Sequence, residues 1–261
     1  MPDSFDNAKS DPTCTPSAPI STASRTASGV ARPPASQNDA WYNRRGRVTD
    51  WSDFDQVVHG DFPGGLKDLD TSNPDVQDAL IRVYEDWIDK AGLDGFRIDT
   101  VKHVEREFWR YFTQKVRQRL APQGKKKFLM FGEAFDGDDE LVGSFTKNGE
   151  LDGVFYFPQY YGVFRSVFAE GKPTSWIEGL LSCRNGPIDK CACYGDKGCN
   201  KGTLHYGETP SPATGVAPKK LTVNFLDNHD VATFAHEVPQ ARAPLGAARI
   251  ARSRRSVCAA K

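Results

Sequence analysis

The sequence lacks any long apolar run and any excess of charge of one sign. Lys plus Arg and Asp plus Glu both number 34 among 261 residues, so the formal net charge is zero. A membrane span would need about 18 or more consecutive apolar residues, and none occurs. Balanced charge also argues against a nucleic-acid or membrane-surface role for the whole chain. The chain begins Met-Pro-Asp-Ser-Phe-Asp without an apolar run, so no signal peptide is visible.

The cysteines lack the Cys-x2–4-Cys knuckles that are usual in zinc sites. Four lie within 17 residues, with the spacing C-x7-C-x-C-x5-C, and two lie near the chain ends: Cys183, Cys191, Cys193, Cys199, Cys14 and Cys258. This pattern favours one or two disulfides over free thiols, and free thiols over a metal site. Disulfides would indicate an exported protein, which conflicts with the missing signal peptide.

Composition divides the chain into three zones. Residues 1–40 are rich in Ser, Thr, Pro and Ala, and we expect them to be disordered because they cannot bury a core. Residues 41–235 alternate apolar runs with amphipathic segments and are predicted to form the folded domain. Residues 236–261 form a basic tail without acids from position 238 onward, also expected to be disordered.

The middle zone predicts strands that alternate with helices. Asn73 is a good helix N-cap and Pro74 suits the first turn, after which apolar residues recur every three to four positions up to Gly92. Residues 105–120 predict a second amphipathic helix, and an aromatic helix is expected around Tyr161. The expected strands are 95–99, 128–133, 154–157 and 221–226. This alternation predicts a parallel sheet, either in a barrel or in an open doubly wound fold.

Acidic residues stand at or just after the ends of three expected strands: Asp99, Glu133 and Asp230. Parallel sheets carry their sites at that edge. Neighbouring strands lie about 4.8 Å apart, so Asp99 and Glu133 could reach the separation of about 5.5 Å typical of retaining glycosidases. Arg97 shares a face with Asp99 and would keep it ionised, as a nucleophile requires. Glu133 would instead need a raised pKa to donate a proton.

Each of these features also has a structural explanation. Asp99 and Arg97 could form an ion pair at a strand end, and Glu133 could cap a helix. Residues 227–230 could form a turn, and residues 102–103 could lie on a solvated face. Three acid-ended strands in one chain weaken these explanations together without eliminating them.

Three segments follow one another along the chain: Gly95-Phe-Arg-Ile-Asp99-Thr-Val-Lys-His103, Phe131-Gly-Glu133 and Phe225-Leu-Asp-Asn-His-Asp230. In order and spacing they resemble three characteristic motifs of the α-amylase family, glycoside hydrolase family 13. The approach segment Gly64-Gly-Leu-Lys-Asp68-Leu-Asp70-Thr fits as well. The first segment is very specific, because Arg, Asp, Lys and His must fall at fixed offsets. The resemblance covers about residues 41–235 and implies a partial (β/α)8 TIM barrel.

By this resemblance, Asp99 is the nucleophile, Glu133 is the general acid/base, and Asp230 stabilises the oxocarbenium-like transition state. Further positions that match the motifs are expected to orient the nucleophile or bind substrate: Arg97, Lys102, His103 and His229. The substrate would be starch or malto-oligosaccharide, and the family leads us to expect a secreted protein. The resemblance also implies a structural calcium, with the Asp68 side chain and the His103 carbonyl among its oxygen ligands.

The sequence departs from the family at both ends. The family's Asp…Asn-His motif on the third barrel strand is absent, and neither the first three strands nor the eighth has a counterpart. We therefore expect about half a barrel, as a truncated or frame-shifted reading frame would give, with little or no hydrolase activity on its own. The alternatives are a transglycosylase or isomerase of the same superfamily, an inactive glucan-binding remnant, and a nucleic-acid-binding protein acting through the basic tail.

Overall fold

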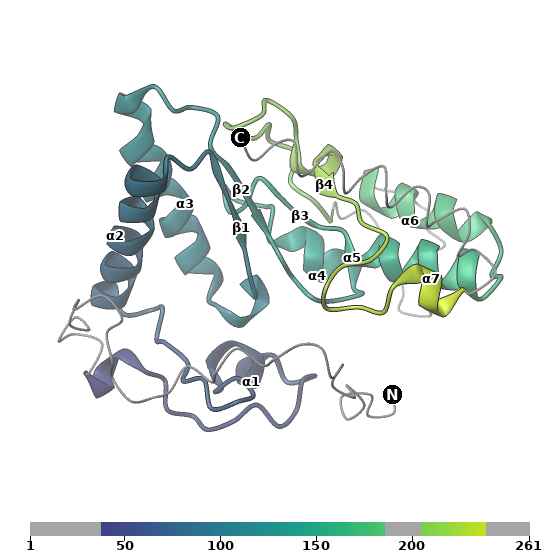
Figure 1. Cartoon of the computed structure of the whole chain (residues 1–261), viewed down its shortest axis with the longest axis horizontal. Coiled ribbons are helices and arrows are strands. Elements are labelled where there is room, and N and C mark those ends of the chain that lie inside the picture. Colours follow the sequence, from purple (N-terminus) through teal and green to yellow (C-terminus); the bar gives the residue numbers. More distant parts are fainter. Residues whose placement is uncertain (1–37, 186–204, 239–261) are drawn as a thin grey trace, which may run out of the picture. The chain divides into compact units, whose positions relative to one another are not determined.

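The computed structural model describes residues 38–185 and 205–238 (Figure 1). Tertiary contacts divide the chain between Asp39 and Ala40, and the features below belong to the unit that begins at Ala40. Residues 1–37, the tail from 239 and the side chains of all six cysteines lie outside the described residues. The expected disorder and disulfides therefore stay predictions.

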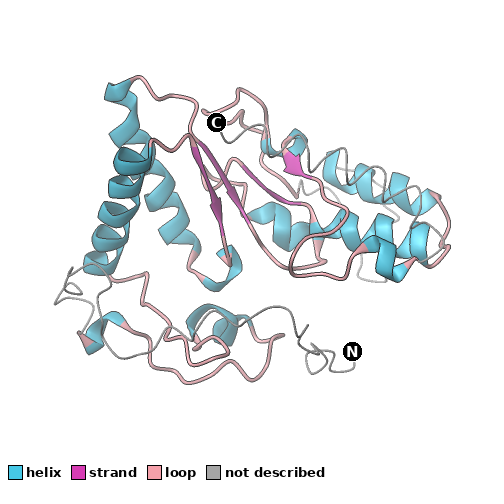
Figure 2. Ribbon diagram, in the orientation of Figure 1, coloured by secondary structure: helices cyan, strands magenta, loops and turns pink. Residues whose placement is uncertain are grey.

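Helices and strands alternate along this unit (Figure 2). The α-helices are α1 (Phe54–His59), α2 (Pro74–Ala91), α3 (Arg106–Leu120), α4 (Asp139–Ser144), α5 (Phe157–Gln159), α6 (Ser175–Asn185) and α7 (Phe234–Glu237). The strands are β1 (Gly95–Ile98), β2 (Leu129–Gly132), β3 (Gly153–Phe155) and β4 (Thr222–Val223). Short 3-10 turns are η2 (Asp39–Trp41), η3 (Val101–His103), η4 (Ala121–Gln123) and η6 (Pro218–Lys220), and η5 (Tyr160–Ala169) is a π-helix.

The long helix α2 confirms its prediction at both ends. The Asn73 side chain accepts a hydrogen bond from the backbone N–H of Asp75 at 2.9 Å, and Pro74 occupies the first turn, where no N–H is needed. The helix ends at Gly92, whose φ of 63° is the left-handed conformation that glycine adopts without a Cβ clash.

The four strands form one parallel sheet in the order β1-β2-β3-β4, which confirms the predicted parallel arrangement. Gly95–Ile98 pairs residue for residue with Leu129–Gly132. The strand expected at 221–226 is shorter than predicted and keeps only two paired residues. Its described neighbour β3 leaves the ladder after Tyr156, whose N–H still donates to the Val223 carbonyl at 3.0 Å, so residues 224–226 have no described strand to pair with.

Strand alternation divides the sheet into two different faces. On the outer face, Met130 and Val154 are fully buried, and the Phe96 ring lies 5.5 Å from Tyr84 of α2. On the other face, which we call the inner face, Arg97 and Phe131 both contact Phe155. The outer face packs against helices and forms the core. The inner face is the one to which Asp99 and Glu133, just past the strand ends, also belong by strand alternation.

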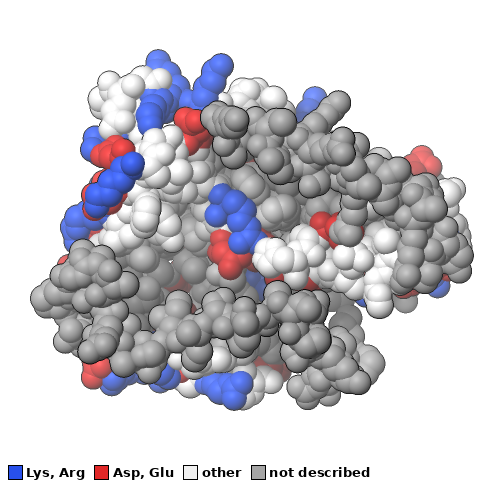
Figure 3. Space-filling view, viewed as in Figure 1, with Lys and Arg blue, Asp and Glu red and all other residues white. Residues whose placement is uncertain are grey.

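The described side chains on the face seen in Figure 3 form no broad patch of one charge. On the face seen in Figure 3, described Lys and Arg side chains alternate with Asp and Glu side chains. No helix among the described residues is long and apolar enough to cross a membrane.

The buried carboxylate of Asp152 ties three parts of the unit together. It is 2% exposed and accepts hydrogen bonds from the backbone N–H of Met130 in β2 (2.8 Å) and from the Ser211 hydroxyl (2.7 Å). Arg117 of α3 donates to it at 2.7 Å. One carboxylate thus accepts hydrogen bonds from β2, from α3 and from the segment before β4.

We expect Asp152→Ala to lower the free energy of unfolding by about 3 kcal/mol or more, because it leaves Arg117 and the Met130 N–H without a buried partner. The matched control is Asp89→Ala, which removes an exposed carboxylate paired with Arg119 and should cost less than about 1 kcal/mol. Urea unfolding of both variants measures the difference. Equal losses would show that Asp152 is no more important than a surface ion pair.

Candidate active site

The two acids expected to do the covalent chemistry leave the sheet side by side. Asp99 follows β1 and Glu133 follows β2, and the last paired residues before them, Ile98 and Gly132, are direct partners. The ladder continues past the strand ends, since the Glu133 N–H donates to the Ile98 carbonyl at 2.7 Å. The Val101 N–H in turn donates to the Glu133 carbonyl at 2.9 Å. The backbones of the two acids are thus fixed relative to each other.

A strained residue connects the two acids. Thr100 lies in the left-handed region, with φ 52° and ψ 35°, which costs a residue with a Cβ on the order of 1 kcal/mol. This conformation directs the Thr100 N–H to Oε2 of Glu133, at 3.0 Å. The residue after the expected nucleophile therefore orients the expected acid.

The two carboxyl oxygens of Glu133 differ. The residue is 4% exposed; Oε2 accepts the Thr100 N–H, while Oε1 is buried and has no hydrogen-bond partner among the described residues. Burial raises the pKa of Glu133, and the charges of Asp99 and Asp230 raise it further, against the Thr100 hydrogen bond and Arg97. A proton on this group would be carried on Oε1, since Oε2 already accepts a hydrogen bond.

Asp99 has the opposite environment. Its side chain is 62% exposed, whereas that of Arg97 is 31% exposed. Nη1 of Arg97 donates to Oδ1 of Asp99, and the guanidinium lies over the Phe155 ring, 5.6 Å from its centroid. One carboxylate is thus open to a ligand with a cation at its side, and the neighbouring one is buried.

The third acid, Asp230, lies on a turn. The Asp230 N–H donates to the Asn228 side chain at 2.9 Å, and Nε2 of His229 lies 3.1 Å from Oδ2 of Asp230. The His229 side chain is 74% exposed and that of Asp230 is 37% exposed. The segment is a turn, as the structural explanation had it, and its acid still acts electrostatically on Glu133.

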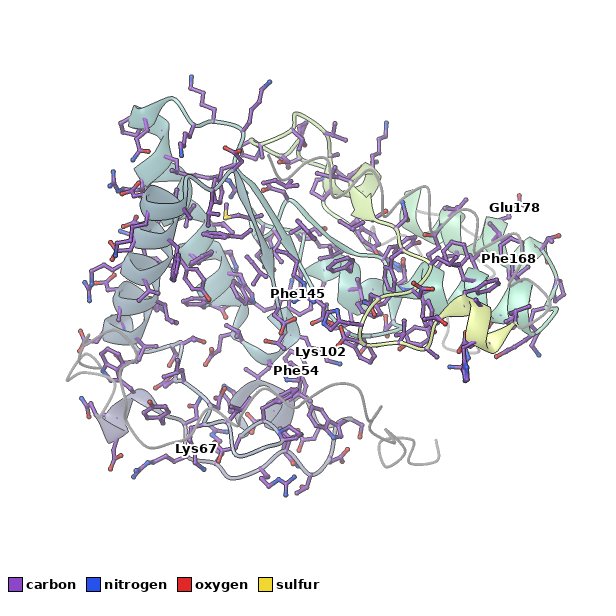
Figure 4. The ribbon with its side chains drawn as sticks, viewed as in Figure 1. Phe54, Lys67, Lys102, Phe145, Phe168 and Glu178 are labelled. Atoms are coloured by element: carbon purple, nitrogen blue, oxygen red, sulfur yellow. The ribbon has the colours of Figure 1, made fainter. Side chains whose placement is uncertain are left out.

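Lys102 and His103, both in η3, make hydrogen bonds to two different segments of the chain. Nζ of Lys102, labelled in Figure 4, donates to the Phe135 carbonyl at 2.6 Å, in the loop after Glu133. Nδ1 of His103 donates to the Val57 carbonyl of α1 at 2.9 Å, so that nitrogen carries the proton, and burial lowers the pKa of the ring. Their roles in substrate binding stay predictions.

Asp68 is the side chain expected to bind calcium. Its Oδ2 accepts a hydrogen bond from the Asn43 amide at 2.6 Å. Burial raises the pKa of Asp68 to about 6, with the charges of Glu105 and Asp61 adding to the effect. A half-buried carboxylate among other acids suits a hard cation. However, the described residues contain no group of three or more His, Cys, Asp or Glu side chains that could hold a metal. Calcium binding by the Asp68 side chain and the His103 carbonyl therefore stays a prediction.

Three contributors are missing from the residues named by sequence alone. The Thr100 contribution is a backbone N–H, which no side-chain motif reveals. Phe155 could have been found by strand alternation, because it lies on the same face of the sheet as Phe131, two residues before Glu133. The amide of Asn43, which partners Asp68, gives no comparable signal because it lies 25 residues away in the chain.

Comparison with known families decides the classification. Residues 29–174 match the family model for the alpha amylase catalytic domain. The chain belongs to the α-amylase family. The matched range contains Asp99 and Glu133 and ends before Asp230.

Individual members of the α-amylase family are similar to this chain in both sequence and fold. An alpha-amylase of Streptomyces lividans is 31% identical over 199 residues, which cover 76% of this chain and 18% of that protein. A cyclomaltodextrin glucanotransferase of Klebsiella oxytoca is 40% identical over 99 residues, 38% of this chain and 15% of that protein. The alpha-amylase of Geobacillus thermoleovorans, solved with acarbose, superposes with a TM-score of 0.58 at 26% identity, covering 80% of this chain and 39% of that one. The partial (β/α)8 fold is thereby confirmed, and the chain spans less than a fifth of these curated relatives.

The raised pKa of Glu133 predicts that the stability of the folded protein depends on pH through this residue. The folded state favours the protonated acid, so Glu133 contributes stability below its unfolded pKa and loses it as pH rises through the folded pKa. Glu133→Gln, which stays neutral, should therefore be more stable than the parent at pH 7.5, with a smaller difference at pH 4. Urea unfolding at both pH values measures this. A constant difference across the two would contradict the raised pKa.

Proposed function

We propose that this catalytic apparatus hydrolyses α-1,4-linked glucans, such as starch and malto-oligosaccharides, with retention of anomeric configuration. The observation that carries the proposal is the pairing of unlike carboxyl groups. Glu133 is buried, its pKa is raised and its Oε1 has no described partner, while Asp99 is exposed and bonded to Arg97. Retaining glycosidases need one such acid and one such nucleophile.

In the proposed first step, the Asp99 carboxylate attacks the anomeric carbon and Glu133 transfers its proton from Oε1 to the glycosidic oxygen. The leaving glucan departs as an alcohol, and the remaining sugar is bonded to Asp99. In the second step, Glu133 takes a proton from a water molecule that attacks the same carbon, and the Asp99 carboxylate is released. Asp230 stabilises the positive charge that develops on the sugar, and His229, Lys102 and His103 bind sugar hydroxyls.

Because the chain covers 15–18% of the length of the curated relatives above, the whole protein's activity is a proposal, and family membership supports the further proposal of secretion. Transglycosylation is the second candidate, because the same apparatus can accept a sugar in place of water. The similarity to a cyclomaltodextrin glucanotransferase supports this second candidate. Product analysis with and without added glucose as acceptor separates the two: longer or cyclic products indicate transfer, and only shorter linear products indicate hydrolysis.

We expect little or no starch hydrolysis by the 261-residue chain, because the described sheet has four strands where closed barrels have eight. Trapping is therefore a sharper test than turnover alone. An activated fluoro-sugar that forms a slowly hydrolysed ester should add one glycosyl mass to the chain, located at Asp99 by peptide mapping. Asp99→Asn should abolish the adduct and lower any starch hydrolysis roughly a thousandfold or more.

The matched control for trapping is Asp86→Asn, which changes an exposed acid on α2 that is paired with Lys90 and should leave labelling unchanged. Labelling of Asp99→Asn at the parental rate would refute the assignment of the nucleophile. Glucan binding without any adduct in the parent would favour the glucan-binding remnant instead.

We also propose that calcium binds at Asp68 and the carbonyl of His103. Millimolar calcium should raise the melting temperature of the parent relative to a chelator, whereas Asp68→Asn should lose this increase. Because protons compete for a carboxylate with a pKa of about 6, the calcium effect should be larger at pH 7.5 than at pH 5. Magnesium and the exposed-site variant Asp50→Asn serve as controls. An equal calcium response in Asp68→Asn would place the ion elsewhere.

A further inference from the structure

An aromatic layer lies on the inner face of the sheet, below the acids. It consists of Phe131, Phe155 and Phe225, which come from β2, β3 and the segment after β4. The Phe155 ring is central, with centroids 5.4 Å from Phe131 and 5.7 Å from Phe225, both in edge-to-face geometry. The layer therefore links the chain segments that lead to Glu133 and Asp230.

Phe155 also touches the segment that leads to Asp99. The guanidinium carbon of Arg97 lies 5.6 Å from the ring centroid, within the range of a cation–π contact. Nη1 of the same guanidinium donates to Oδ1 of Asp99. Within the described part of the chain, Arg97 makes no other hydrogen bond or ring contact, so these two interactions determine how its planar group is held.

We propose that Phe155 is a positioning residue for Asp99, acting through Arg97. An arginine side chain has many rotamers, and a hydrogen bond to one exposed carboxylate leaves its plane free to turn. The ring face of Phe155 fixes that plane, and the fixed guanidinium then orients the carboxylate oxygens of Asp99. The consequence for catalysis rests on the proposed function, in which Asp99 attacks the sugar.

The ring face, rather than the bulk of Phe155, carries this role. Leu would fill much of the same space but offers no π-face to a cation, whereas Tyr keeps both the ring and its quadrupole. Phe155→Leu should therefore release Arg97, and Phe155→Tyr should retain it. The edge contacts to Phe131 and Phe225 hold the Phe155 ring itself in place.

The first arm of the test observes Arg97 directly, in the full chain. The method is NMR spectroscopy, and the side-chain Nε–H resonance of Arg97 is assigned by its loss in Arg97→Lys. In the parent, the ring current of Phe155 should displace the chemical shift of this signal. The displacement should persist in Phe155→Tyr and disappear in Phe155→Leu. Melting temperatures of all variants confirm that each is folded.

The second arm measures the rate of adduct formation at Asp99, and kcat and KM with an aryl maltoside. Phe155→Leu should lower the adduct rate and kcat about three- to tenfold, or about 0.7–1.4 kcal/mol at 1.36 kcal/mol per tenfold, with KM within about twofold. Phe155→Tyr should restore most of the rate. The control is Phe168→Leu: Phe168 is 55% exposed, its ring stacks on Phe164, and it lies well away from Lys102 in Figure 4.

The outcomes separate this inference from the proposed function. An Arg97 signal that is undisplaced in the parent, or unchanged in Phe155→Leu, overturns the inference whatever the activity. A lost displacement with an unchanged adduct rate shows that the contact exists but does not position Asp99, which also overturns it. Absence of any adduct in the parent contradicts the proposed function, and the Arg97 signal still decides whether Phe155 holds the guanidinium.

Discussion

The site depends on one constraint above all, the in-register parallel pairing of β1 with β2. Ile98 opposite Gly132 places Asp99 and Glu133 at the same height, and the hydrogen bonds that follow extend that register past the strand ends. A slip by one residue would turn one acid to the opposite face of the sheet. Gly95 reinforces the pairing, because a Cβ there would lie 2.6 Å from the Leu129 carbonyl oxygen. Close backbone packing at Gly95 thus helps to fix the register independently of the acidic side chains.

Given this register, environment makes two similar acids different. Glu133 is buried, and its charged form is disfavoured by that burial and by two nearby carboxylates. Asp99 projects further into solvent and has a guanidinium at its side. The arrangement costs stability, since it combines a buried acid, a carboxyl oxygen without a hydrogen-bond partner among the described residues, and a left-handed Thr100. Such local costs are typical of sites in which groups are held for chemistry rather than for folding.

Sequence reasoning was most successful where local signals are strong. The caps of α2 and the strand–helix alternation follow from residue type and spacing, and the acids at the strand ends follow from motif positions. The short length of β4 could not be predicted, because it depends on where the neighbouring strand leaves the ladder. The raised pKa of Glu133 depends on burial by residues distant in the chain. The Thr100 amide and the Asn43 partner of Asp68 are long-range contacts, on which a single sequence is silent.

The three acids are not held equally firmly, and the difference follows from strand pairing. Asp99 and Glu133 emerge from β1 and β2, which pair over four residues and continue into backbone bonds around Thr100. Asp230 follows β4, which pairs over only two residues, and its turn is exposed. Phe225 compensates in part, because its ring stacks on Tyr160 at 5.6 Å and meets Phe155 edge-on. Asp99 and Glu133 are therefore built into the most extensively paired part of the described sheet. The position of Asp230, the proposed stabiliser of the transition state, depends instead on aromatic packing at the sheet's edge.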